Sequence, residues 1–404
     1  MYQQKLASLR KAQNNGDPGS LGPVTAFKGE AFFDQFANLS PSVRDLLEAQ
    51  HRLEGYGEYF VCGDLHGDLL VLLGVLRLAG LIDDDANWLP KSDSDAPRRC
   101  FVQLGDMVDR GGRGLTSVDT SMMPREELNM MEYLHSLNDQ AMEHGDRVVS
   151  VSGNHEMYAV EAAFNSSFAK QWNFETKATA CPFPQQGISR SDLFRKPGAL
   201  RYFAFVRPPI LVSSIGWLFC HGDIPVPQLR EFLKSHSKLL RRLRGQTRVP
   251  FANCVVAATN MLWATHILML GGDSYMLDLL RPALPGAESS DPNFFRNNMS
   301  PFPLAVCTCR TLANMGDRTE CDCEGTVEAV AQELSLDWET SGGIALGHTV
   351  QARLSSKCGG KVQLLDLGMS EAFRGYNKDH RIGLLRIFVA QELEHRERGV
   401  FTKT

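Results

Sequence analysis

Residues 59–67 read YFVCGDLHG, an apolar run typical of a buried strand, followed at once by Asp64 and His66. Four more stretches repeat this order of apolar run and polar cluster: CFVQLGDMVDRG (100–111), VVSVSGNHE (148–156), WLFCHGD (217–223) and, after a weaker run, SGGIALGHT (341–349). Adjacent buried strands deliver their ligands at one edge of a sheet. The five motifs therefore predict one rigid site in an α/β fold.

The residue types in these motifs favour a metal site. Asp, His and Asn side chains together suit a pair of divalent ions, which serve phosphoester chemistry when they lie roughly 3.5–4 Å apart. Taken alone, an Asp-x-His or a Gly-Asn-His is usually only a turn. We give that simple interpretation to His135, His144 and His266, but not to the five motifs taken together.

The motif set resembles the metal-dependent phosphoprotein phosphatase (calcineurin-like metallophosphoesterase) superfamily, whose signatures are GDxHG, GDxVDRG, GNHE and two later histidines. All five occur here in the expected order. Residues 62–88, 139–156 and 347–373 look like the bacterial-type Shewanella-like protein phosphatase branch. The similarity covers most of residues 56–376 and weakens in the middle of that range.

This resemblance implies a role for each motif residue. Asp64 and His66 would hold a first metal, Asp106 would bridge, and Asn154, His221 and His348 would hold the second. The metals would be Mn²⁺, Fe or Zn²⁺, all of which accept such ligands.

The resemblance also implies the catalytic groups. His155 would be the general acid and Asp109 would orient its ring, while Arg110, with Asn154, would bind substrate. The planar fork of an arginine suits phosphate oxygens.

The chain departs from the branch at one point. An SP-x-W-x-R segment usually supplies what we take to be a second phosphate-binding arginine, but residues 300–305 read SPFPLA, with Ala305 in the arginine position. Four other arginines could compensate: Arg195, Arg201, Arg244 and Arg248.

Composition is that of an ordinary globular protein. The 404 residues are 43% hydrophobic and 22% charged, and a net charge of −5 gives no reason to expect nucleic-acid or membrane binding. We also expect no apolar run long enough to span a bilayer. The first residues lack the apolar core of a secretory signal, so a cytoplasmic location is expected, with organellar targeting left open.

The ten cysteines do not resemble a small disulfide scaffold. None is followed by arginine six positions later, which excludes a cysteine-dependent phosphatase. Cys307 and Cys309, and likewise Cys321 and Cys323, form C-x-C pairs. These pairs could close a zinc site, form disulfides, act as a redox-sensitive patch or remain unbonded.

Helices are expected at 68–79, 124–143 and 227–243, and closing strands at 361–367 and 382–390. The fold class is therefore α/β. The resemblance adds two mixed sheets packed face to face with helices outside. The expected organisation is an N-terminal extension with a helix (1–55), a catalytic domain (56–376) with insertions near 160–200 and 271–340, and a closing strand and tail (377–404).

The expected function is hydrolysis of phosphate monoesters on proteins by a metal-bridging hydroxide, with a lean to phosphotyrosine. One alternative is a hydrolase of dinucleoside polyphosphates or nucleotide caps. Another is a phosphatase-like binding module that has lost turnover, which Ala305 would favour. Oligomeric state stays open.

Overall fold

A computed structural model provides the structure of the chain. It describes residues 29–42, 44–45, 52–93, 95–109, 123–172, 188–246, 249–284, 300–315, 320–339, 341–370, 373, 381–388 and 393–399.

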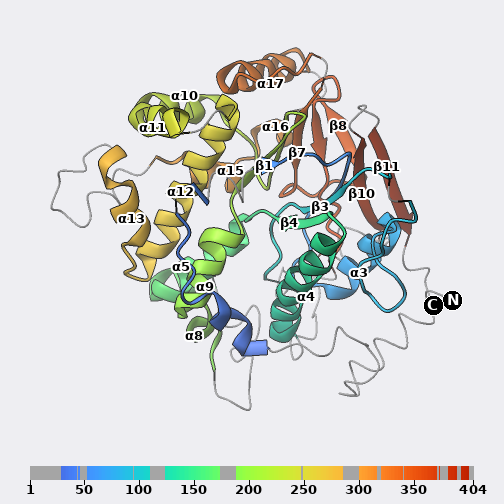
Figure 1. The fold of residues 1–404 in the computed structure, drawn as a ribbon, viewed down its shortest axis with the longest axis horizontal. Coiled ribbons are helices and arrows are strands. Elements are labelled where there is room, and N and C mark those ends of the chain that lie inside the picture. The colour runs from blue at the N-terminus through green and yellow to red at the C-terminus, as the bar shows by residue number, and fades with distance from the viewer. Residues whose placement is uncertain are drawn as a thin grey trace.

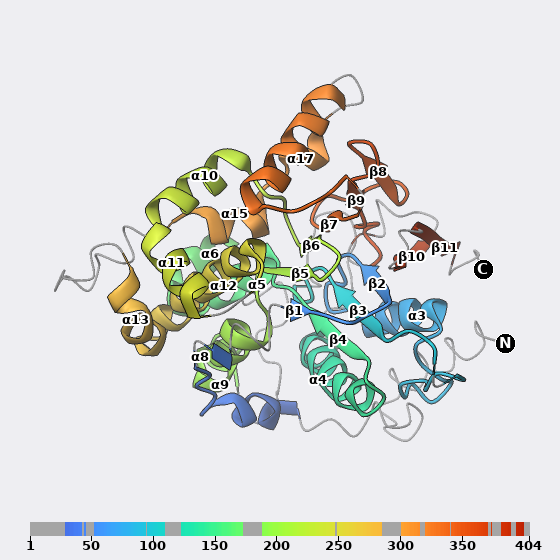
Figure 2. The ribbon, with the colours of Figure 1, turned by 45° about the horizontal axis from the view of Figure 1, so that its top comes forward.

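Two mixed β-sheets lie at the centre of the molecule, with helices outside both (Figures 1 and 2). The six-stranded sheet contains, in spatial order, β1 (Arg52–Leu53), β5 (Ile210–Ser213), β6 (Trp217–Cys220), β7 (Gly343–Leu346), β9 (Val362–Leu364) and β8 (Ser355–Lys357). The five-stranded sheet runs β11 (Leu393–Gly399), β10 (Arg381–Phe388), β2 (Glu58–Cys62), β3 (Arg99–Gln103) and β4 (Arg147–Ser150). The ring of Tyr59 on β2 contacts that of Phe219 on β6, so the sheets pack together. The predicted fold class is confirmed.

All five predicted motif strands are present, and their directions explain the site. β2, β3 and β4 are parallel neighbours, with Cys62 opposite Gln103 and Gln103 opposite Ser150. In the other sheet β6 and β7 are parallel, with Cys220 opposite Leu346. Within each sheet the motif loops therefore leave neighbouring strands at the same edge.

Helices surround the sheets: α3 (Leu69–Ala79), α4 (Met123–Glu143), α5 (Asn154–Phe164), α6 (Ser166–Trp172), α8 (Arg190–Arg195), α9 (Pro197–Arg201), α10 (Val226–Ser235), α11 (Ser237–Gln246), α12 (Phe251–Leu270), α13 (Tyr275–Leu280), α15 (Phe302–Thr308), α16 (Thr311–Asn314) and α17 (Glu320–Leu334). Two predicted helices are confirmed as α3 and α4. Asp68 caps α3 by accepting from the backbone N–H of Val71, and Gly80 ends it with a φ of 73°.

Other elements differ from the sequence-based expectation. The single helix predicted at 227–243 is two helices, α10 and α11, which meet at His236. The Ser235 hydroxyl donates to the carbonyl of Glu231, a backbone contact that tends to bend helices. The Pro, Gly and Asn clusters of the stretch 271–340 predict irregular structure, but where it is described this stretch is largely helical. Strand β11 was not predicted.

The short helix η3 (Gly29–Phe36) belongs to the core, although its segment appears polar in the sequence. Phe32, Phe33 and Phe36 are at most 6% exposed and contact the ring of Tyr202. Tyr202 begins the π-helix η5 (Tyr202–Val206). Three closely spaced aromatic rings are enough to anchor this segment.

The expectation of no membrane-length apolar run is wrong for α12. This 20-residue helix is long and apolar enough to cross a bilayer by length and composition, but 78% of its apolar window is buried inside the protein. It packs against α5, α11, α13 and β5. Such burial is that of a central core helix.

A disulfide joins Cys323 of α17 to Cys358, just after β8. Cys307 and Cys309, the C-x-C pair that is described in full, are both free. The disulfide therefore joins two different elements rather than the two cysteines of one C-x-C pair. The bond closes a loop over a sequence separation of 35 residues.

Replacing Cys323 by serine should therefore lower the free energy of unfolding of the oxidised protein by about 3 kcal/mol, because the unfolded chain regains loop freedom. Denaturant unfolding without reductant measures this loss. Cys358→Ser should match it, and the double variant should lose no more. Unchanged midpoints in both single variants would contradict the pairing.

Candidate metal and catalytic centre

Five of the six predicted metal ligands fall into two overlapping groups. Ligand atoms of Asp64, His66 and Asp106 lie within 4.8 Å of one another, and so do those of Asp106, His221 and His348. Asp106 belongs to both groups, the position required of a bridging carboxylate. Side chains that follow four strands, β2 and β3 of one sheet and β6 and β7 of the other, thus converge at one point.

The sixth predicted ligand, Asn154, lies at the first position of α5. Its Oδ1 lies 3.0 Å from Nε2 of His221, so it joins the group around His221. Oδ2 of Asp106 lies 3.2 Å from the same nitrogen.

Backbone carbonyls orient two of the imidazoles. Nδ1 of His66 donates to the carbonyl of Val108 at 3.0 Å, and Nδ1 of His221 to that of Leu104 at 2.8 Å. In each ring Nε2 then faces Asp106, at 3.6 and 3.2 Å. Histidine ligands of metals are usually held in this way, with one ring nitrogen donating and the other coordinating.

The electrostatics of the cluster fit divalent cations. Burial raises the pKa of Asp64 well above its ordinary value, and the carboxylate of Asp366 raises it further. Burial alone would lower the pKa of His221, but Asp106 and Asp64 outweigh it and raise that pKa to about 10. Asp64, Asp106 and Asp366 are each at most 2% exposed. Buried carboxylates need positive charge beside them, which a divalent cation supplies while binding these same donors.

His348 has the opposite environment. Burial and the charge of His221 lower its pKa to about 3, so its imidazole is neutral, the form that binds metals. Its backbone N–H donates to Oδ1 of Asp64 at 3.0 Å, which ties the last motif to the first.

Four predicted site residues hold a left-handed backbone conformation. The φ angles of His66, Asp106, Asp109 and His348 lie between 41° and 70°. A non-glycine residue in this region costs on the order of 1–3 kcal/mol, and such residues cluster at functional sites. The contacts that surround these loops must therefore maintain this backbone conformation.

The motif glycines allow the loops to approach one another. A Cβ on Gly153 would lie 2.2 Å from Oδ1 of Asp106 and 2.5 Å from its backbone N. Glycines in such motifs are expected to allow sharp turns and close approach of the backbone to a bound phosphate. The contacts show that Gly153 makes room for the carboxylate of Asp106.

Gly153→Ala should therefore displace Asp106 and lower turnover in the expected phosphoester hydrolysis by at least about tenfold, since small misplacements in a site have large effects. Gly245→Ala is the matched control, because a Cβ there meets nothing within 4 Å. Turnover equal to wild type in Gly153→Ala would argue against this packing.

His155 and Asp109 form a hydrogen-bonded pair beside the ligand groups. Nδ1 of His155 lies 2.7 Å from Oδ2 of Asp109, and both residues are buried. Nε2 of His155 lies 3.8 Å from Oδ2 of Asp106. The imidazole is thus held at one nitrogen and directs the other toward the ligand groups.

Glu156, the last residue of the GNHE motif, holds the loop that carries Asp106. Its carboxylate accepts from the backbone N–H groups of Asp106, Met107, Val108 and Gly153, at 2.6 to 3.2 Å. The sequence analysis gave Glu156 no role, although the motif itself was the available signal.

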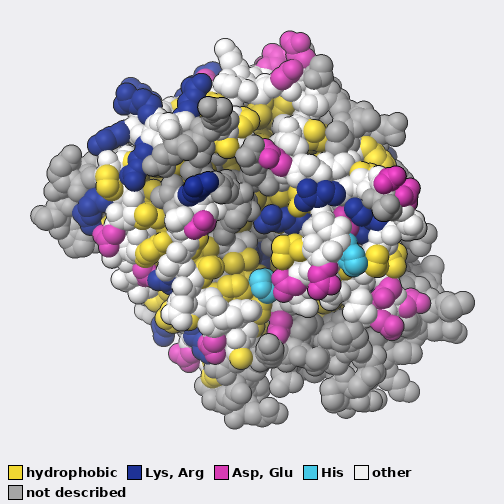
Figure 3. Space-filling view, viewed as in Figure 1, with side chains coloured by type: hydrophobic (Ala, Val, Ile, Leu, Met, Phe, Trp, Pro, Cys, Tyr) yellow, Lys and Arg dark blue, Asp and Glu magenta, His cyan; other side chains and the backbone are white. Residues whose placement is uncertain are grey.

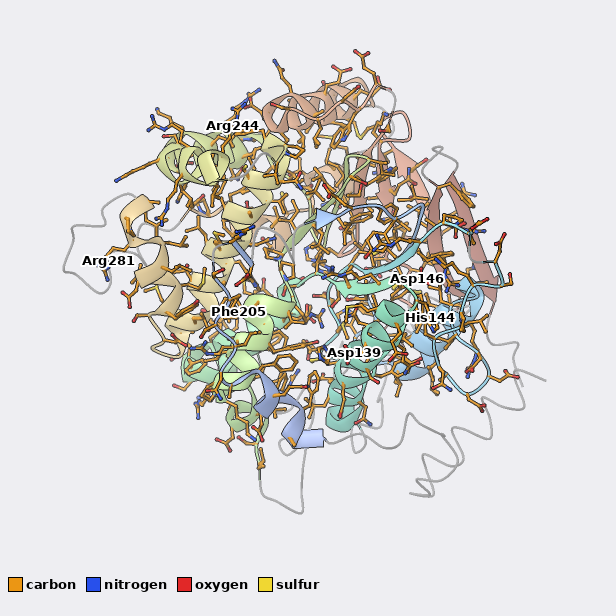
Figure 4. All side chains as sticks on the ribbon, viewed as in Figure 1. Asp139, His144, Asp146, Phe205, Arg244 and Arg281 are labelled. Carbon is orange, nitrogen blue, oxygen red and sulfur yellow. A yellow bond between two sulfur atoms is a disulfide. The ribbon has the colours of Figure 1, made fainter. Side chains whose placement is uncertain are left out.

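None of the predicted arginines that the structure describes lies at the ligand cluster. Arg110 and Arg248 lie outside the described residues. Arg195 donates to a backbone carbonyl of α5, and Arg201 pairs with an aspartate before α13 at 2.6 Å. Arg244 lies on α11 near the edge of the molecule, over a ring of α12 (Figure 4).

Arg310 and Asp366 are two further site residues that were not predicted. Nε of Arg310 donates to Nε2 of His348 at 2.9 Å, and Arg310 lies five positions after Ala305. Asp366 follows strand β9 and accepts from the backbone N–H of Gly368. Asp366 could have been found from the sequence, because it follows an apolar run in the same way as the aspartates of the other motifs.

A family model and several known proteins match parts of this chain. A family model described as calcineurin-like phosphoesterase matches residues 59–279, more than half of the chain. Shewanella-like protein phosphatase 2 of Arabidopsis thaliana is 33% identical over 115 residues, which cover 28% of this chain and 25% of that protein. Shewanella-like protein phosphatase 1 of Plasmodium berghei is 26% identical over 168 residues, covering 42% and 39%. The chain thus spans less than half the length of these relatives.

Solved structures also overlap with the chain. A cold-active protein-tyrosine phosphatase of a psychrophilic Shewanella species aligns over 87% of this chain and 84% of its own, with 16% identity and a TM-score of 0.49. A protein serine/threonine phosphatase from Saccharomyces cerevisiae aligns over 93% and 91%, with 12% identity and a TM-score of 0.47.

Proposed function

Because the chain belongs to the calcineurin-like phosphoesterase family, we propose that it hydrolyses phosphate monoesters on proteins. The observation that carries this proposal is the sharing of Asp106 between two ligand groups, with His155 beside it. The family implies two divalent metal ions, and we assign their binding to the six predicted ligands. When bound, such ions would polarise the phosphate and lower the pKa of a bound water to near neutral.

His155 is suited to proton donation. With Nδ1 held by Asp109 at 2.7 Å, its proton donor is Nε2, on the side of Asp106. With Asp109 accepting the Nδ1 proton, the protonated ring can give its Nε2 proton to the leaving oxygen of the alcohol or phenol. The predicted roles of both residues are compatible with this geometry.

Aromatic rings beside His155 support the lean to phosphotyrosine. The centroids of Tyr158 and Trp172 lie 6.0 and 5.7 Å from that of His155, and Phe168 packs against both of these rings. A leaving group protonated by His155 must lie next to this surface. Stacked or edge-on contact with a phenol ring is favourable, whereas a serine side chain offers no ring.

Arg310 supports the phosphate end of the proposed site. It is exposed, and its guanidinium lies against His348 at the edge of the second ligand group. A phosphate there would meet the guanidinium in the place of the arginine that Ala305 does not provide. We therefore assign Arg310 to phosphate binding.

Turnover of three substrates tests the function: a phosphotyrosine peptide, a phosphoserine peptide and a dinucleoside tetraphosphate, each with Mn²⁺. We expect the phosphotyrosine peptide to be hydrolysed fastest, a chelator to abolish turnover, and added Mn²⁺ to restore it. Trp172→Leu should reduce the preference for phosphotyrosine without lowering turnover of phosphoserine.

Two outcomes would contradict this proposal. Faster hydrolysis of the dinucleoside tetraphosphate would indicate the nucleotide-directed class of enzyme. Metal-dependent binding of phosphopeptides without turnover would indicate a binding module instead.

A further inference from the structure

Arg190 is almost completely buried, an unusual environment for an arginine. Its side chain is 1% exposed, and it is among the largest fully buried side chains of the described residues. It lies at the start of α8, in a segment that the sequence placed in an insertion between motifs. A guanidinium is rarely buried unless charged partners surround it.

Two carboxylates surround this guanidinium. Nη2 of Arg190 donates to Oε2 of Glu127 at 3.0 Å and to Oε1 at 3.2 Å. Nη1 lies 3.8 Å from Oδ1 of Asp109. Glu127, on α4, is 3% exposed, and its Oε1 also accepts from the backbone N–H of Asp109 at 2.5 Å. Arg190 and Glu127 therefore hold Asp109 by its side chain and by its backbone.

The two carboxylate oxygens of Asp109 face two different partners. Oδ2 faces Nδ1 of His155 at 2.7 Å, while Oδ1 faces Arg190. Its backbone is left-handed, with a φ of 70°, a conformation that surrounding contacts must maintain. Without the guanidinium, Glu127 and Asp109 would be two buried negative charges close together, and their repulsion would move Asp109.

We propose that Arg190 is a positioning residue for the proton donor His155 and that it acts through Asp109. This inference rests on the proposed function, because it assumes that His155 protonates a leaving group. The alternative is a purely structural role, in which Arg190 only fastens α8 to α4. The two roles differ in how the effect of a substitution depends on the leaving group.

Proton donation matters most when the leaving oxygen is strongly basic. A p-nitrophenolate leaves readily without a proton, whereas the phenolate of tyrosine, with a pKa of about 10, leaves poorly. If Arg190 acts through His155, Arg190→Met should reduce kcat about 100-fold on a phosphotyrosine peptide and less than about threefold on p-nitrophenyl phosphate. KM for the peptide should change little.

Three variants sharpen this experiment. Arg190→Lys keeps the positive charge and the fold but loses the planar N–H donors of the guanidinium. Its kcat on the peptide should therefore lie between those of Arg190→Met and the wild type. His155→Asn should show the same dependence on the leaving group. Arg195→Met, on the same helix but half exposed, should leave both rates unchanged.

Proton NMR gives a readout that does not depend on activity. The Nδ1 proton of His155, hydrogen-bonded to a buried carboxylate, should resonate downfield and be absent in His155→Asn. It should also be lost or shifted in Arg190→Met and Arg190→Lys, and kept in Arg195→Met.

The inference is overturned if folded Arg190 variants lose both substrates in equal proportion, lose neither, or keep the His155 resonance unchanged. If Arg190→Met does not fold, Arg190→Lys decides by the same criteria. A wild-type chain that hydrolyses neither ester would contradict the proposed function, while the NMR signal would still decide whether Arg190 positions His155.

Discussion

Replacing His155 by asparagine should lower kcat on a phosphotyrosine peptide by about 10²- to 10⁴-fold while leaving the fold intact. The asparagine amide can still donate a hydrogen bond to the Asp109 carboxylate, but it cannot supply a proton to the leaving oxygen. Steady-state kinetics with saturating Mn²⁺ measures this loss, and thermal unfolding verifies the fold.

His144→Asn is the matched control. His144 is exposed just after α4 (Figure 4), so the same substitution there should leave kcat unchanged. A His155→Asn enzyme that retained full activity on the peptide would remove His155 from the proposed reaction.

Replacing Asp106 by asparagine should have an even broader effect. The substitution removes the negative charge that both ligand groups share, so metal affinity and turnover should fall together, with kcat reduced by at least about 100-fold. Asp139→Asn, on the exposed side of α4, is the matched control (Figure 4). Excess Mn²⁺ should restore the activity of Asp106→Asn only slightly, because the side chain that both ligand groups share has lost its charge.

The motif strands could be predicted because their apolar runs are typical of strands buried inside a sheet, although the run before His348 is weaker and β4 is buried only in part. Asp68 and Gly80 likewise marked the ends of α3 through their capping preferences. The break between α10 and α11 could not be predicted in this way, since both helices are amphipathic and basic. Their charged side chains form a dark blue group on the surface (Figure 3).

Within each sheet, parallel strands bring the predicted ligands of neighbouring motifs together, whereas the meeting of ligands from the two sheets was implied only by the family resemblance. Arg310, Glu127 and Arg190 could not be found by that reasoning. Each acts across a long sequence separation: Arg190 lies 63 residues from Glu127, and Arg310 lies 38 from His348. Such pairs are visible only after folding, and neither Glu127 nor Arg190 lies within a recognisable motif.

Metal content per chain tests the central claim most directly. After metal loading and gel filtration, wild-type protein and His144→Asn should each retain about two Mn²⁺ ions per chain, as a two-metal centre requires. Asp106→Asn should retain fewer than one. A wild-type chain that holds no metal, or an Asp106→Asn chain that holds two as firmly as wild type, would contradict the account.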